Sequence, residues 1–143
     1  MEKFAKIQAI SKAISEKNDC SVKAVALACD VPYRVAHKAL ENQGRKEGRG
    51  VLMGQIKDAI TSLGYTATPA AYTAKTAITL GRDKLLAKGH YIAMMNGHVA
   101  AVVNGKVQDW TNGRRYHVVQ VWLVVPTESR KVRAKLAKQV FEK

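Results

Sequence analysis

Three Asn-Gly pairs, at residues 96–97, 104–105 and 112–113, divide the second half of the chain into short apolar runs. Asn and Gly easily adopt the backbone angles of two-residue hairpin turns, so an Asn-Gly pair between apolar runs is a strong hairpin signal. The runs around these turns read HYIAMM, HVAAVV, KVQDW and RRYHVVQVWLVV, and Pro126 follows the last of them. The pattern therefore predicts an antiparallel β-meander in the C-terminal part of the chain.

The N-terminal part shows the spacing of helices instead. Residues 2–16 and 51–64 carry apolar residues every three or four positions, and the segments 21–31 and 33–44 between them are rich in Ala, Val and Leu. The two apolar stripes comprise Phe4, Ile7, Ile10 and Ile14 in the first segment and Leu52, Ile56, Ile60 and Leu63 in the last. We therefore expect helices, the last of them over 51–64, before the first strand.

Together these patterns predict the α+β class, with helices first and an antiparallel sheet after them. We expect one domain over residues 1–143, with a helical part at 1–64 and a mainly β part at 65–126. The β part includes a short helix at 80–89, capped by Thr79. A chain of 143 residues is long enough to bury one core without metals or disulfides.

Basic residues outnumber acidic ones, 24 to 11, which gives a formal net charge of +13. The excess is concentrated near the C-terminus, where residues 127–143 are predicted to form a basic amphipathic helix. Candidates there for binding nucleic acid or an acidic protein are Arg130, Lys131, Arg133, Lys135 and Lys138. A purely solubilising role for this helix is the alternative.

No apolar run approaches the length that spans a membrane, and the N-terminal sequence lacks the apolar core of a signal peptide. The two cysteines, Cys20 and Cys29, would lie about 13 Å apart if one helix carried both, too far for a disulfide. These features predict a protein with free thiols that is neither secreted nor membrane-spanning.

Cys20 follows two short polar residues and opens a predicted helix, in the sequence NDCSVKAVALA. A helix N-terminus lowers the pKa of a thiol, and its backbone N–H groups can stabilise a developing oxyanion. Cys20 is therefore a candidate nucleophile, with its own backbone N–H as an oxyanion donor. The alternative is a thiol that packs as a small apolar side chain, the role that we expect for Cys29.

The second Asn-Gly turn fixes a register that brings a histidine to a carboxylate. If the turn has two residues, Val103 pairs with Lys106, and His98 and Asp109 become diagonal neighbours on one face, about 7 Å apart by backbone. A carboxylate beside an imidazole fixes its tautomer and stabilises its protonated form. The hairpin thus predicts a base and the acid that orients it, whereas no such partner is evident in the sequence for His37, His90 or His117.

The pieces NDCSVKAVALA and GHVAAVVNGKVQDW resemble papain-like cysteine peptidases, in particular small bacterial and phage members with a bacteriocin-processing-peptidase-like core. The resemblance implies that Cys20 is the nucleophile, His98 the general base and Asp109 the orienting acid. Members usually carry a Gln before the Cys as an oxyanion donor. This chain has none there, and Asn18 is the nearest amide.

The resemblance further implies a peptide or protein substrate, cleaved or transferred at a peptide or isopeptide bond without metal or cofactor. It implies a location in the cytoplasm of a bacterial host or in a virion. Trp110 and Tyr91 are aromatic residues that could line the cleft, with core packing as the alternative.

Two other functions fit parts of the sequence. Residues 21–40 resemble a helix-turn-helix of the Lac-repressor type, in which Tyr33 and Arg34 would begin the recognition helix that reads DNA. The tight turn of that motif normally carries Gly, where this chain has Cys29 and Asp30. The other alternative is a catalytically inactive papain-like protein that acts as a binding or inhibitor protein.

Overall fold

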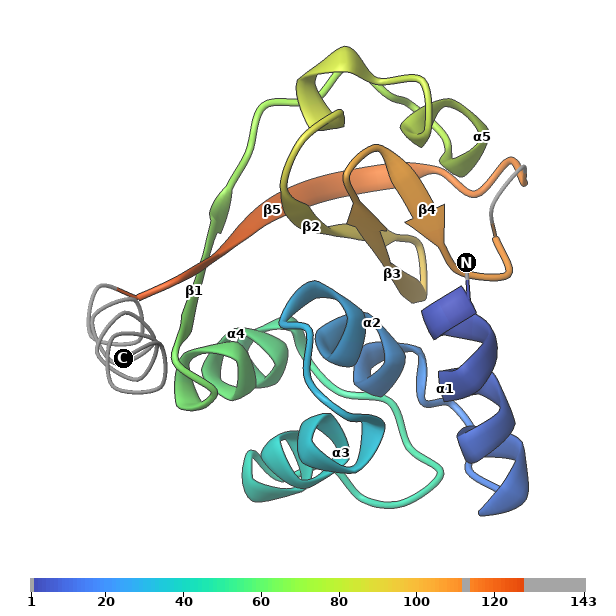
Figure 1. Ribbon diagram of the computed structural model, residues 1–143, viewed down its shortest axis with the longest axis vertical. Coiled ribbons are helices and arrows are strands. Elements are labelled where there is room, and N and C mark those ends of the chain that lie inside the picture. The colour runs from blue at the N-terminus through green and yellow to red at the C-terminus, as the bar shows by residue number, and fades with distance from the viewer. Residues whose placement is uncertain (1, 112–113, 128–143) are drawn as a thin grey trace, which may run out of the picture.

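Helices occupy the first half of the chain and strands the second, so the fold is α+β as predicted (Figure 1). The structure is a computed structural model that describes residues 2–111 and 114–127. The helices are α1 (Glu2–Ala13), α2 (Cys20–Ala28), α3 (Tyr33–Asn42), α4 (Met53–Ser62) and α5 (Ala77–Leu80), with a 3-10 turn η1 (Lys84–Leu86). The strands are β1 (Tyr65–Pro69), β2 (His90–Met95), β3 (His98–Val103), β4 (Lys106–Gln108) and β5 (Val118–Pro126). The predicted helix at 127–143 and the third Asn-Gly pair lie outside the described residues, apart from Thr127.

The five strands form one antiparallel sheet in the order β1-β5-β2-β3-β4. The first two Asn-Gly pairs close the hairpins β2–β3 and β3–β4, as predicted. In the second turn Asn104 and Gly105 have φ angles of 49° and 81°, the positive values that such a turn requires. Val103 pairs with Lys106, so the register expected from the turn is confirmed.

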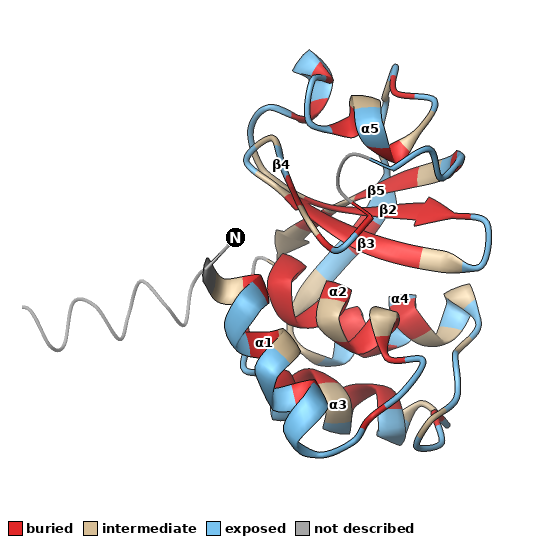
Figure 2. Cartoon of the chain, turned by 90° about the vertical axis from the view of Figure 1, so that its right-hand side faces the viewer, coloured by how far each residue is buried: buried red, intermediate tan, exposed pale blue. Residues whose placement is uncertain are grey.

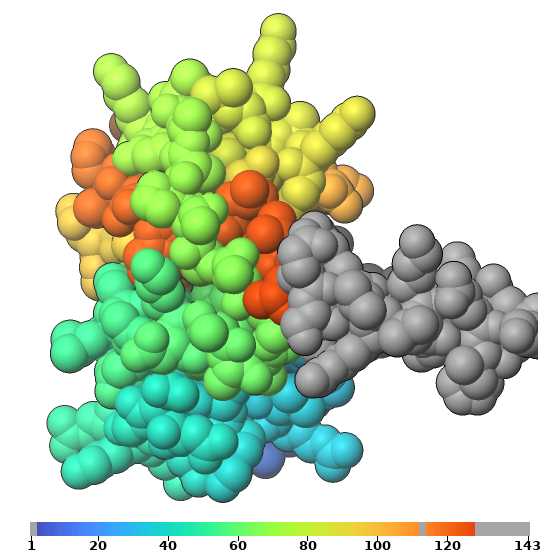
Figure 3. Space-filling model, turned by 90° about the vertical axis from the view of Figure 1, so that its left-hand side faces the viewer, coloured from blue at the N-terminus to red at the C-terminus, as the bar shows by residue number. Residues whose placement is uncertain are grey.

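The last strand departs from the predicted meander. β5 begins at Val118 and pairs with β2 on one side and β1 on the other, instead of continuing beyond β4. The nine residues between β4 and β5 are too many for a hairpin turn, and they lead the chain back across the sheet. Figure 3 shows the opposite edge, where β1 (green) lies against β5 (orange) above α4 and α3.

Both faces of the sheet are covered, and β2, β3 and α2 are the most buried elements (Figure 2). α2 packs on β3, while the segment with α5 and η1 covers the other face. α1 and α3 in turn cover the side of α2 that faces away from the sheet. This enclosure explains the sequence of α2, where seven of nine residues are buried.

Two predicted apolar stripes are only partly buried. Phe4 and Ile7 enter the core, but Ile10 and Ile14 are exposed, and Ile14 lies beyond the end of α1 at Ala13, just before the turn at Ser15, whose φ is 56°. In the stripe expected over 51–64, Ile56 and Ile60 are buried, whereas Leu52 precedes the helix and is 76% exposed.

The helix expected at 80–89 is also different. α5 starts earlier, at Ala77, and the chain then breaks at Gly81 before the separate turn η1. The break comes from Asp83, a buried carboxylate that accepts backbone N–H groups from Thr73, Ala74 and Leu85 at 2.6–3.0 Å. Among the described helices, none is both long and apolar enough to cross a membrane.

Candidate active site

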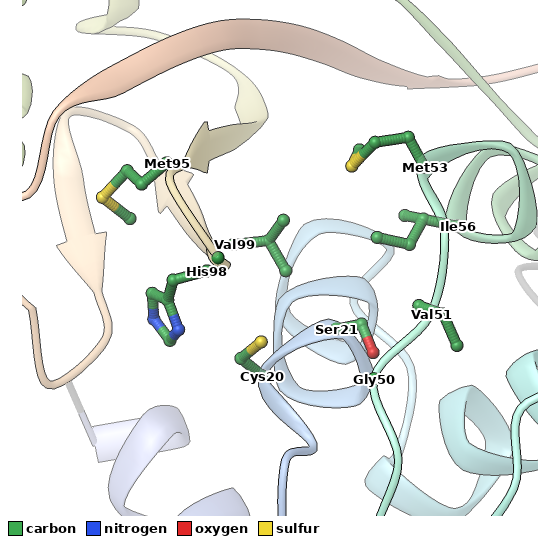
Figure 4. A pocket seen from close by; sticks show the side chains of 10 residues that line it. Cys20, Ser21, Gly50, Val51, Met53, Ile56, Met95, His98 and Val99 are labelled. Carbon is green, nitrogen blue, oxygen red and sulfur yellow. The ribbon is translucent and has the colours of Figure 1, made fainter.

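The start of α2 meets the start of β3, and this meeting places Cys20 beside His98 (Figure 4). Cys20 is the first residue of its helix and His98 the first residue of its strand, directly after the Asn-Gly turn. Because α2 packs along β3, its N-terminus lies against that turn. The structure therefore brings together two residues far apart in the sequence, as the proposed nucleophile and base require.

The thiol and the imidazole stabilise each other's charged forms. Burial raises the pKa of the Cys20 thiol, but hydrogen bonds with the His98 side chain and the Val99 backbone outweigh it, and the pKa falls below its ordinary value. Burial lowers the pKa of His98, but the hydrogen bonds to Asp109 and then to Cys20 raise it to about 9. The pair therefore favours a thiolate beside an imidazolium, the reactive state of a cysteine nucleophile.

Asp109 holds the imidazole from its other side. His98 Nε2 donates to Asp109 Oδ2 at 2.6 Å, which leaves Nδ1 for the thiol. The same Oδ2 accepts the Thr111 hydroxyl at 2.6 Å and the Thr111 N–H at 3.1 Å. Asp109 is 2% exposed and Thr111 fully buried, so the carboxylate is fixed in a dry setting. His98 thus interacts with both the Cys20 thiol and the Asp109 carboxylate.

Two aromatic rings cover His98. Trp110 lies 5.0 Å from the imidazole between ring centroids, and Tyr116 lies 6.2 Å from it. The two aromatic rings meet edge to face at 5.3 Å. Trp110 is 47% exposed, so it shields the imidazole from solvent rather than packing in the core. Tyr91, the other aromatic considered, is buried in the cluster of residues on the opposite face of the sheet.

The two candidate oxyanion donors, the Cys20 backbone N–H and the Asn18 side-chain amide, differ in the hydrogen bonds that they already make. The Cys20 backbone N–H belongs to the first turn of α2, where N–H groups have no partner within the helix. Asn18 lines a pocket with Cys20 and His98, but its Nδ2 donates to the Gly48 carbonyl at 2.9 Å. The second N–H of that amide is the one that a substrate could use.

A network around Asp19 fixes the start of α2. Its Oδ2 accepts the hydroxyls of Ser11 at 2.6 Å and Tyr33 at 2.7 Å, while its Oδ1 pairs with Lys23 at 3.3 Å. Tyr33 is 2% exposed. A side chain held in this way is not available to contact DNA, whereas Arg34, the other residue named in the helix-turn-helix interpretation of residues 21–40, is exposed.

A buried ion pair fixes the loop 44–50 next to the same segment. Arg45 Nη2 lies 3.1 Å from Glu16 Oε1, and both side chains are almost fully buried. His37 Nε2 donates to Glu16 Oε2 at 2.7 Å, and the Gly48 N–H donates to Oε1 at 2.7 Å. His37 therefore has a carboxylate partner, which the sequence analysis had not found.

Two pockets meet at the Cys20–His98 pair. One, of about 320 Å³, is mainly apolar. Its apolar lining comprises Val51, Met53, Ile56, Met95 and Val99 (Figure 4). The other, of about 640 Å³, is polar. Its lining includes Glu16, Lys17, Asn18, Asp19, Lys23 and Trp110. Gly50 and Gly97 border both pockets, so an extended chain could cross the thiol between them.

The remaining predicted residues lie elsewhere. Cys29 is fully buried just after α2, and neither cysteine forms a disulfide. His90 Nδ1 donates to the Ala28 carbonyl at 2.8 Å, and His117 is exposed. The basic residues Arg130, Lys131, Arg133, Lys135 and Lys138 lie outside the described residues.

The sequence did not predict the residues that hold the site residues and the neighbouring loop in position. Thr111 carries one weak signal, a hydroxyl two residues after the acid, which is a common position for capping a carboxylate turn. The Val99 backbone and the Glu16–Arg45 pair carry none. Within residues 2–111 and 114–127, no cluster of three or more His, Cys, Asp or Glu side chains is placed to hold a metal.

Comparisons with protein-family models, with curated proteins and with solved structures found no match to this chain.

The raised pKa of His98 predicts how thiol reactivity varies with pH. Below about 9 the protonated imidazole holds the pKa of the Cys20 thiol under its ordinary value, so the rate of alkylation by iodoacetamide should fall by less than tenfold per pH unit there. An ordinary thiol loses about tenfold per unit below its pKa of about 8.5. We expect an inflection at about 9, where His98 loses its proton. Alkylation rates measured from acid to alkaline pH check this.

Asp109→Asn is the matched variant for this measurement. It removes the charge that raises the pKa of His98, so the inflection should move to lower pH. A wild-type profile with the slope of a free thiol throughout would show that the ion pair does not form.

Proposed function

We propose that the chain is a papain-like thiol hydrolase or acyl transferase, with a peptide or isopeptide bond as its target. The supporting observation is that His98 lies beside Cys20 and is hydrogen-bonded to Asp109, at the point where a helix N-terminus meets a β-hairpin. A nucleophile, a base and an orienting acid in this arrangement suit acyl transfer. The papain-like resemblance agrees with this arrangement.

The reaction would begin with attack of the Cys20 thiolate on the substrate carbonyl carbon. The oxyanion would accept hydrogen bonds from the Cys20 backbone N–H and the free N–H of Asn18. His98 would give its proton to the leaving amine as the C–N bond breaks, which leaves a thioester on Cys20. His98 would then take a proton from water, or from an acceptor amine, as that nucleophile releases the acyl group.

The two pockets would position the substrate on either side of the scissile bond. The apolar pocket would take an apolar side chain, and the polar pocket would hold the segment on the other side of the thiol. By the same resemblance we place the protein in a bacterial cytoplasm or a virion. The basic C-terminal segment would provide a separate contact with nucleic acid or an acidic protein.

Acylation by p-nitrophenyl acetate tests the proposal. At pH 6.5 the wild-type protein should release one equivalent of nitrophenol in a burst and carry one acetyl group on Cys20, because the lowered pKa of its thiol makes it more reactive than an ordinary thiol. Mass spectrometry locates the acetyl group. A Cys20→Ala variant should show no burst.

An ordinary exposed thiol provides the control for intrinsic thiol chemistry. Thr61 lies exposed on α4, so Thr61→Cys in the Cys20→Ala background supplies one. If Cys20 reacts no faster than that thiol, the enzyme proposal fails and the inactive papain-like binding protein becomes the better explanation.

A further inference from the structure

Positive charge gathers on one side of the Cys20–His98 pair. Lys17 and Lys23 line the polar pocket, and an adjoining hollow of about 330 Å³ is lined by Lys46 and Arg49. The two cavities share Gly50, since both are bordered by the loop 44–50. Four cationic residues therefore line two cavities that share a border, and the first of these cavities also contains the thiol.

The acidic side chains that line the polar pocket are already paired with other residues of the protein. Glu16 lines the polar pocket, but its side chain is fully buried and paired with Arg45 and His37. Asp19 is 4% exposed and engaged by two hydroxyls and Lys23. The exposed Glu47 borders neither cavity. The field that a substrate meets on this side is therefore positive.

Three of the four cationic side chains take no part in these ion pairs. Lys17, Lys46 and Arg49 are exposed, and none pairs within 4 Å with an acidic side chain in the described part of the chain. Lys23, by contrast, is half-buried and satisfied by Asp19. Unpaired cations beside a nucleophile attract anions to it, and an Arg guanidinium can hold a carboxylate through two hydrogen bonds.

We infer that the substrate of this site is an acidic peptide, with Asp or Glu side chains close to the scissile bond on the side of Lys17 and Arg49. The inference rests on the proposed function and adds the class of peptide to it. A peptide fits better than a nucleic acid because Lys17 lines the same pocket as a thiol proposed to attack carbonyls. The pocket across that thiol is apolar, which suits an amino-acid side chain.

Alkylation with a charged and a neutral reagent measures the field at Cys20. The ratio of the rate with iodoacetate to the rate with iodoacetamide isolates the effect of the negative charge, since the two reagents share one leaving group. In Lys17→Glu/Arg49→Glu this ratio should fall about threefold at 0.1 M salt, and further at lower salt, which is the effect expected when two charges at about 10 Å are reversed in screened water.

Arg82→Glu/Lys88→Glu is the matched control. Both residues are exposed in the segment that covers the other face of the sheet, away from α2, so the same change of net charge should leave the ratio within about 30% of the wild-type value. Circular dichroism checks that both double variants fold. Equal falls in the two variants would overturn the inference, because net charge alone would then explain the effect.

Occupancy of the cleft supplies a second readout. Poly-L-glutamate should slow alkylation of wild-type Cys20 by iodoacetamide, and the Lys17→Glu/Arg49→Glu variant should lose this protection. Protection by a DNA oligonucleotide with none from poly-L-glutamate would overturn the inference in favour of nucleic acid.

The result also separates this inference from the proposed function. Cys20 could be alkylated fast while the ratio of the iodoacetate rate to the iodoacetamide rate stays unchanged in Lys17→Glu/Arg49→Glu. This result would agree with the proposed enzyme and would refute the acidic substrate. If both reagents alkylate Cys20 only at the rate of an ordinary exposed thiol, the proposed function and the acidic substrate are both refuted.

Discussion

Replacing His98 by alanine should reduce the steady-state hydrolysis of p-nitrophenyl acetate at pH 6.5 by at least about 100-fold. The substitution removes the cation that keeps the Cys20 thiolate, and it removes the base that activates water for release of the acyl group. Both losses act on the same turnover, which is why the expected effect is large. Release of nitrophenol after the burst measures it.

Another histidine supplies the control for this variant. His117 is exposed, so His117→Ala should keep at least half of the wild-type rate, since neither thiol nor carboxylate depends on that side chain. Circular dichroism of His98→Ala checks that the loss is chemical. Turnover by a folded His98→Ala protein within tenfold of wild type would mean that another group serves as the base.

The His98–Asp109 half of the site could be predicted because it is local. A two-residue turn at Asn104-Gly105 fixes which residues oppose each other, and the pleat of the strands then fixes which share a face. No such rule connects Cys20 to this hairpin. Their meeting depends on how α2 packs against β3, and the only sequence signal for it was a resemblance to papain-like peptidases.

The position of β5 could not be predicted for a similar reason. A strand that lies between two others and is covered on both faces is apolar throughout, so its sequence fits any interior place in the sheet. Val121 and Val124 are buried on β5, and nothing in them distinguishes pairing with β2 from pairing with β4. The only indication that β5 does not pair with β4 was the length of the segment between them, which is too long for a hairpin turn.

Arg45 shows most clearly where sequence reasoning ends. It stands in RKEGRG, a segment typical of an exposed charged loop, yet its side chain is 1% exposed and paired with Glu16. The neighbours Lys46 and Arg49 are exposed as the composition suggests. Of the basic residues in this segment, Arg45 alone is buried there, because the buried carboxylate of Glu16, distant in the sequence, lies opposite to it.

Arg45→Met should lower the free energy of unfolding by about 3–5 kcal/mol, because it leaves the buried Glu16 carboxylate without its main counter-charge. Methionine keeps the apolar volume of the side chain, so the loss reports the charge. Urea unfolding at pH 7 measures it. Lys38→Met, which breaks an exposed pair with Glu41 on α3, should change the same free energy by less than about 0.5 kcal/mol.

The dependence on pH distinguishes an ion pair from simple packing. Burial alone would raise the pKa of Glu16, but the hydrogen bonds from Arg45 and His37 lower it to about 2. A carboxylate with a lowered pKa stabilises the fold above its ordinary pKa of 4.5, and this contribution is lost as the pH falls towards 2. Wild-type stability should therefore fall between pH 5 and 3 more steeply than that of Glu16→Gln/Arg45→Met, which lacks both charges and should be more stable at pH 7 than Arg45→Met alone. Parallel curves for the two proteins would show that Arg45 contributes through packing, and the loop 44–50 would then depend on its backbone hydrogen bonds to keep the cleft in shape.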